Sequence, residues 1–139
     1  MSERDQSPPL TISSLDLNRI EHLLAQDEYH HMPGVEGLMR ELERANIVDP
    51  EEIPPTVVTM NSIVRFKEVS TSREHEMTLV YPRDAGRPGC VSIFAPVGSA
   101  LLGLSVGQRI TWAGPSGRPL ELEIEEILYQ PESSGELYR

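Results

Sequence analysis

The stretch CVSIFAPVGSALLGLSVGQRITW, residues 90–112, decides the fold of this chain. Its first part, Val91–Phe94, is a β-type run that ends at Pro96, because proline has no N–H to donate to a strand ladder. The apolar residues 99–104 then predict a helix of one or two turns, and Arg109–Trp112 predicts the next strand. The backbone freedom that such tight reversals need comes from three glycines, Gly98, Gly103 and Gly107.

On both sides of this stretch, apolar and polar residues alternate with the period of a half-buried strand. The further predicted strands are Val57–Met60, Val64–Val69, Glu76–Tyr81 and Leu120–Glu125. The alternation slips at Glu126–Ile127, where we expect a β-bulge. The glutamates on the last strand are expected to lie on its solvated face: Glu121, Glu123, Glu125 and Glu126.

The N-terminal part of the chain has the period of helices. Ser13 predicts an N-cap, with Asp16 as the acidic partner of a capping box. The apolar stripes are Leu17, Ile20, Leu23 and Leu24 on the first helix and Val35, Leu38, Leu42 and Ala45 on the second, the latter with the spacing of a coiled-coil seam. A turn at 29–34 joins the two helices, so we expect an antiparallel hairpin.

Four segments follow from these patterns. They are a disordered tail at 1–11, a helical hairpin at 12–48, a stiff proline-containing linker at 49–56, and a β domain with one short helix at 57–139. Helices followed by strands predict an α+β fold.

Composition limits the function. The 139 residues include 22 acidic and 12 basic side chains, a net charge of −10, and residues 1–56 alone carry 12 acidic against 4 basic side chains. Such a chain is not expected to bind nucleic acid directly, and its charge favours a basic protein surface. The single cysteine, Cys90, excludes an internal disulfide, and no apolar run approaches the ~18 residues of a membrane span. Because the first residues do not read as a signal peptide, we expect a cytoplasmic protein with no membrane partner.

Five phrases of the sequence resemble one bacterial family. They are VVTMNS at 57–62, LVYP at 79–82, APVG at 95–98, ALLGL at 100–104 and LYQPE at 128–132. Their order resembles the GreA/GreB transcription factors, and within that family the Rnk regulators, over residues 10–135. The resemblance implies a C-terminal domain of FKBP-like fold. It also implies binding to RNA polymerase at the secondary-channel rim, in competition with Gre factors and DksA, and it implies no kinase chemistry.

The resemblance also implies where the polymerase is bound. The loop that carries Ala95, Pro96, Val97 and Ser99 would face a coiled coil of the polymerase large subunit. The other interpretation is that Val97, Leu101 and Leu102 belong to the core, and the residues leave the loop evenly divided between the two.

The hairpin tip decides between regulation and catalysis. Asp27 and Glu28 stand where Gre factors carry acids that help to hold a catalytic Mg²⁺, but adjacent side chains diverge. A first helix of roughly 13 residues spans about 20 Å, which is short for a cleavage factor. His30 and His31 are interpreted as exposed residues rather than as a metal site.

The sequence therefore predicts a polymerase-binding regulator that is not an enzyme, with no cofactor and no metal. One alternative is a Gre-type factor that stimulates transcript cleavage through its acidic tip. A second alternative is an FKBP-like peptidyl-prolyl isomerase with Trp112 in its pocket, although Trp112 reads better as core.

Overall fold

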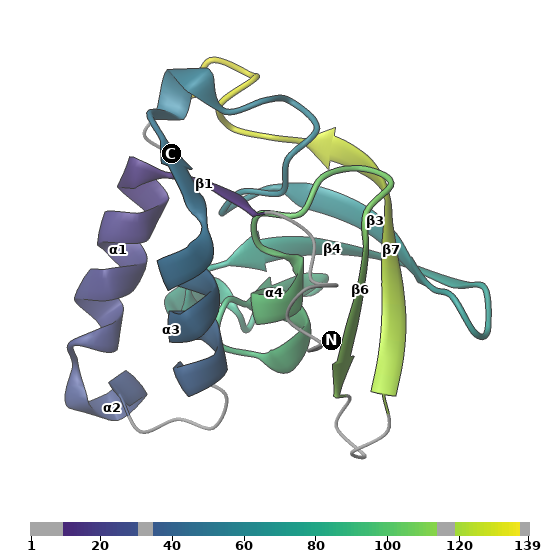
Figure 1. The fold of residues 1–139 in the computed structure, drawn as a ribbon, viewed down its shortest axis with the longest axis horizontal. Coiled ribbons are helices and arrows are strands. Elements are labelled where there is room, and N and C mark those ends of the chain that lie inside the picture. Colours follow the sequence, from purple (N-terminus) through teal and green to yellow (C-terminus); the bar gives the residue numbers. More distant parts are fainter. Residues whose placement is uncertain (1–9, 31–34, 114–118, 137–139) are drawn as a thin grey trace.

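A five-stranded sheet is the main element of the computed structural model (Figure 1), which describes residues 10–30, 35–113 and 119–136. Its strands lie in the order β5-β4-β3-β7-β6. Their bounds are Ile63–Glu68 (β3), Arg73–Val80 (β4), Cys90–Ser92 (β5), Arg109–Ala113 (β6) and Pro119–Tyr129 (β7). Neighbours are antiparallel except β4 and β5, which are parallel. The mixture of helices and strands predicted from the sequence is thus present, whereas the FKBP-like description stays a prediction.

The N-terminal residues form a helical layer closed by a small sheet. Strand β1 (Thr11–Ser13) leads into α1 (Ser14–Leu24), which is followed by the single turn α2 (Asp27–His30). Helix α3 (Val35–Arg44) runs back in the opposite direction and leads into β2 (Asn46–Val48), which pairs with β1 in parallel (Figure 1). The ends of the layer nearest β1 and β2 are therefore held together by a backbone ladder.

One hydrophobic cluster joins the helical layer to the sheet. It contains Ile20 and Leu24 of α1, Val35, Leu38 and Leu42 of α3, and the sheet residues Val64, Phe66, Leu79, Leu122 and Ile124. The predicted apolar stripes are confirmed, because these helix residues are buried and Leu17, Leu23 and Ala45 pack against the cluster. The segment boundaries predicted from the sequence stay a prediction, but side chains of both main segments share this core.

The short helix of the decisive stretch begins earlier than predicted. Helix α4 covers Pro96–Leu101, not 99–104, and the preceding strand ends at Ser92, before Ile93 and Phe94. Pro96 explains why α4 starts here. The first N–H groups of a helix have no partner within the helix, so a residue without an N–H costs nothing at this position. Gly103 and Gly107 have positive φ as expected, whereas Gly98 does not and has a different role.

Two further predictions were wrong. Val57–Met60 is not a strand, because Val58 exchanges backbone hydrogen bonds with Gly103 and Leu104 and the chain then turns at 59–62. The predicted disordered tail reaches too far, because Leu10 is buried and Thr11 belongs to β1; residues 1–9 lie outside the described part. The linker also contains a 3-10 turn, Pro50–Glu52, capped by Asp49.

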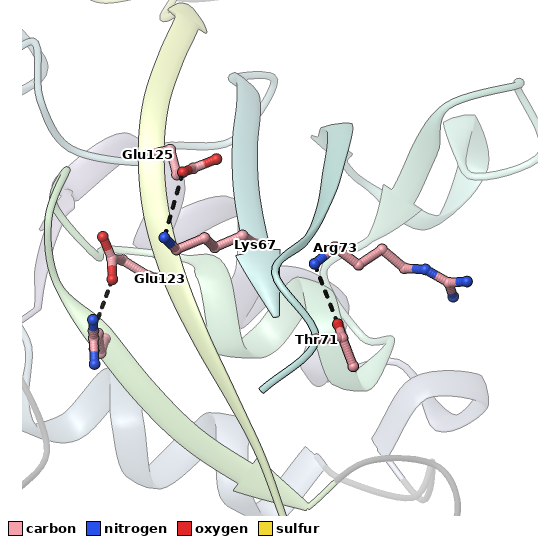
Figure 2. A network of polar contacts seen from close by, with 6 residues as sticks. Lys67, Thr71, Arg73, Glu123 and Glu125 are labelled. Atoms are coloured by element: carbon pink, nitrogen blue, oxygen red, sulfur yellow. Dashed lines mark hydrogen bonds and ion pairs between the residues drawn. The ribbon is translucent and has the colours of Figure 1, made fainter. Parts of the chain in front are cut away.

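The outer face of the sheet carries pairs of opposite charge across neighbouring strands. Arg65 on β3 pairs with Glu126 at 2.8 Å, and Arg109 on β6 pairs with Glu123 at 2.7 Å. Figure 2 shows Lys67 reaching from β3 towards Glu125 on β7, a pair at 3.9 Å. The predicted wet face of the last strand is confirmed, and the β3–β7 register shifts on both sides of the predicted bulge.

Candidate functional site

The candidate site is the loop between β5 and α4, which is held rigidly by Ser92. The Phe94 N–H donates to Ser92 Oγ at 3.0 Å and the Ala95 N–H donates to the Ser92 carbonyl oxygen, also at 3.0 Å. Gly98 lies against the same carbonyl, so a Cβ added there would be 2.0 Å from the oxygen. The sequence needs glycine at 98 because the backbones approach so closely, and not for φ freedom.

The far end of the helical layer lies beside this loop. The ring of Tyr29 on α2 contacts the ring of Phe94, with centroids 5.1 Å apart and planes tilted by 36°. Phe94 is buried and Tyr29 is half-buried. The end that the sequence predicted as a hairpin tip is therefore packed onto the sheet unit next to α4.

A buried carboxyl group joins the helical layer to the sheet at another place. The Met60 N–H donates to Asp16 Oδ2 at 3.1 Å, and the Tyr81 hydroxyl donates to Asp16 Oδ1 at 3.4 Å. Burial raises the pKa of Asp16 to about 6, and burial together with the Asp16 charge raises the pKa of Tyr81. Only half of the predicted capping box is formed: the Asp16 N–H donates to Ser13 Oγ at 3.0 Å, whereas the Asp16 carboxylate accepts hydrogen bonds from across the core.

The predicted site residues of the loop lie at the start of α4. Ala95 caps α4, Pro96 is its first residue, and Val97 and Ser99 are half-buried within it. Leu101 and Leu102 are buried, so the core interpretation is right for these two, whereas Val97 packs against the core and stays half-buried. Polymerase binding by Ala95, Pro96, Val97 and Ser99 stays a prediction.

At the helical end, Asp27, Glu28 and His30 belong to α2, and the Glu28 side chain is exposed. His31 lies outside the described residues. The Tyr29–Phe94 contact places α2 beside the loop, which the sequence did not predict because Tyr29 and Phe94 are far apart in the chain.

Two negative findings apply to the described residues only. No three His, Cys, Asp or Glu side chains among residues 10–30, 35–113 and 119–136 are grouped to hold a metal ion. None of the helices in that same part has the length and apolar character that crossing a membrane would require.

Two family models match successive parts of the chain. Residues 53–129 match the family model described as transcription elongation factor GreA/GreB, C-terminal, and residues 8–48 match that of the Rnk N-terminus. The chain is 45% identical over 130 residues to a regulator of nucleoside diphosphate kinase of Escherichia coli K12, covering 93% of this chain and 96% of the relative. It is 32% identical to transcription elongation factor GreA of Thermodesulfovibrio yellowstonii, covering 79% of this chain and 70% of that protein.

A solved structure has the same fold. A prokaryotic transcription elongation factor GreA/GreB from Nitrosomonas europaea superimposes with a TM-score of 0.70 at 52% identity, covering 88% of this chain and 100% of that one. The chain therefore belongs to the GreA/GreB family of transcription elongation factors, in the group that carries an Rnk N-terminal segment.

Proposed function

We propose that the chain regulates transcription by binding RNA polymerase at the rim of the secondary channel, through the α4 loop with Ala95, Pro96, Val97 and Ser99. There it competes with Gre factors and DksA and does not itself stimulate transcript cleavage. Family membership supports a role in transcription, since the relatives are named transcription elongation factors and regulators.

The observation that carries the proposal is the contact between Tyr29 and Phe94. Because this contact packs the end of the helical layer onto the sheet unit, α2 lies beside the α4 loop. Helix α1 has 11 residues and is about 16 Å long, and the Tyr29–Phe94 contact keeps α2, which carries Asp27 and Glu28, beside the loop. This geometry favours docking at an entrance over action at a distant catalytic centre.

Charge supports the choice of partner surface. The exposed Glu28 lies on α2 beside the loop, and residues 1–56 carry 12 acidic against 4 basic side chains. Such a surface is attracted to basic protein surfaces, which accelerates and orients encounter.

Binding to core polymerase tests the proposal. We expect immobilised wild-type chain to retain core RNA polymerase, and Pro96→Asn to weaken retention by about tenfold, as for a central interface residue. Pro55→Asn, a matched substitution at an exposed proline of the linker, leaves retention unchanged. If wild-type chain at micromolar concentration does not bind core polymerase, the proposal is wrong.

A stalled elongation complex tests the absence of cleavage. Incubated with the chain and Mg²⁺, the complex is expected to keep its RNA at full length, while added Gre factor shortens the RNA and an excess of the chain suppresses the shortening. Shortened RNA with the chain alone, abolished by Asp27→Asn/Glu28→Gln, would support the cleavage alternative instead.

A further inference from the structure

An open groove between α1 and α3 has no role in the function proposed above. It has a volume of about 580 Å³ and is called the α1–α3 groove here. Its described lining residues are Leu17, Glu21, Leu24 and Ala25 of α1 and its C-terminal end, and Met39, Leu42, Glu43, Ala45 and Ile47 from α3 to β2. All of them except the two glutamates are apolar.

The groove brings two exposed apolar side chains together. Among residues 10–30, 35–113 and 119–136, four large hydrophobic side chains are exposed, and two of them, Met39 at 38% and Ile47 at 39%, line this groove. The other two, Val106 at 40% and Leu128 at 41%, are outside the groove's described lining. Exposed apolar side chains that gather in one hollow are typical of a surface that a partner covers.

The charged groups of the groove are both acidic and come from opposite helices. Glu21 is an exposed residue of α1 and Glu43 an exposed residue of α3, so carboxylates border the apolar floor on either side. A second copy of the chain carries a net charge of −10 and would be repelled. A ligand with cationic side chains flanking an apolar stripe complements both features.

The length of the groove defines the shape of that ligand. On α1 the lining extends from Leu17 to Ala25, eight residues further along the chain, which is about 12 Å or two helical turns. A helix of two turns presents apolar residues at i, i+4 and i+7 along one face, with room for basic residues on its flanks.

We propose that the α1–α3 groove binds a basic amphipathic helix of a partner protein, with apolar anchors against Met39 and Ile47 and cationic side chains beside Glu21 and Glu43. The proposal rests on different residues from polymerase binding by the α4 loop, and either can fail while the other holds.

A designed peptide tests the groove directly. The probe is a fluorescein-labelled helical peptide of about 14 residues with Leu at i, i+4 and i+7 and Lys at the flanking positions. We expect saturable binding by fluorescence anisotropy at low salt, weakened at least ~3-fold when salt is raised to about 0.5 M. The same peptide with Glu in place of Lys should not bind. No binding of the Lys peptide up to about 1 mM, or equal binding of both peptides, would overturn the proposal.

Matched pairs of exposed apolar residues locate the binding. The variant Met39→Ser/Ile47→Ser is expected to lower the affinity for the Lys peptide by about tenfold, since Met39 and Ile47 would contact the apolar anchors of the peptide. Val106→Ser/Leu128→Ser removes side chains of nearly equal exposure elsewhere and should leave the affinity unchanged. Amide chemical-shift changes induced by the peptide should be confined to α1, α3 and β2. Equal losses in both double variants, or shifts centred on the outer face of the sheet, would contradict the groove.

Reversing the charges of Glu21 and Glu43 should reverse which peptide binds, a result that a folding defect cannot produce. The variant Glu21→Lys/Glu43→Lys should no longer bind the Lys peptide and should bind the Glu peptide instead. Glu36→Lys, at an exposed position of α3 outside the groove lining, should keep the binding preference of the wild type. Sedimentation of the wild-type chain alone tests whether a second copy of the chain occupies the groove. Self-association that Met39→Ser/Ile47→Ser abolishes would show that a second copy fills the groove, and the proposal would be wrong.

Discussion

The junction between the helical layer and the sheet differs from the sheet's outer face in how each uses charge. At the junction the carboxyl group of Asp16, a residue that is 4% exposed, accepts hydrogen bonds from the Met60 N–H and the Tyr81 hydroxyl. On the outer face Arg65 and its acidic partners are about half exposed to solvent. Water screens the exposed ion pairs but does not reach the buried carboxyl group. A change of charge should therefore alter the free energy of unfolding strongly at the junction and weakly on the outer face.

The largest effect is expected where backbones touch in the site loop. Gly98→Ala places a Cβ against the Ser92 carbonyl, which requires α4 to move, and should lower the free energy of unfolding by about 3 kcal/mol. Urea denaturation measures this loss. Gly37→Ala on the exposed face of α3, where an added Cβ meets no atom within 4 Å, should instead raise stability by about 0.5–1 kcal/mol. Equal tolerance of both would mean that the loop is not rigidly packed.

The next effect is a pH dependence at the junction. The ordinary pKa of Asp16 is 3.8 and burial raises it to about 6, so the folded state holds the proton more tightly than the unfolded state. The resulting stabilisation is fully present below pH 3.8 and is lost as the pH rises through 6. Its full size is at most about 3 kcal/mol.

Asp16→Asn keeps an oxygen that can accept from Met60 N–H and does not titrate, so it isolates this contribution. The difference in unfolding free energy, wild type minus variant, should fall as the pH rises from about 4 to 7, by chemical denaturation at each pH. A difference that stays constant or rises would show that the Asp16 carboxyl is better solvated than its position between α1 and the sheet implies.

A smaller loss of stability is expected when the Tyr29–Phe94 ring contact is removed. Tyr29→Ala should lower the free energy of unfolding by about 1–2 kcal/mol and increase hydrogen exchange of the α2 amides, because the partner of Phe94 is removed. Tyr29→Phe keeps the ring and should stay close to wild type. Unchanged exchange in the alanine variant would mean that α2 is held by other contacts.

The smallest effect is expected on the outer face. Arg65→Gln breaks pairs with Glu76 and Glu126 but should change the free energy of unfolding by no more than about 0.5 kcal/mol, measured by thermal or urea denaturation. If Arg65→Gln lowers stability as much as the junction variants do, the outer-face pairs contribute as much as the buried contacts, and the difference between the two regions is wrong.

The features that the sequence predicted correctly depend on neighbours in the chain. Ser13 caps α1 by binding the N–H of Asp16, three residues on, and the stripe of α3 follows from its helical period. The alternation of β7 likewise placed its glutamates on the wet face.

The features that it missed depend on residues distant in the chain. Asp16 meets Met60 and Tyr81, and Tyr29 meets Phe94, through packing that no local pattern encodes. The strands β1 and β2 have only three residues each, too few for a period to be seen. One miss had a local signal: Pro96 favours the first helical position and would have placed the start of α4. Similarly, Met39 beside the buried Leu38 could have indicated an exposed apolar site on α3.

The parallel pairing of β1 with β2 gives the two long helices unequal freedom at their ends. At one end the ladder from Thr11–Asn46 to Ser13–Val48 ties the start of α1 to the exit of α3. At the other end the ring of Tyr29 packs on the ring of Phe94, beside the buried Leu24 and Val35. The start of α1 and the exit of α3 are therefore joined by main-chain hydrogen bonds, whereas α2 is joined to the sheet unit through side chains, and we expect the β1–β2 amides to exchange more slowly with solvent than those of α2.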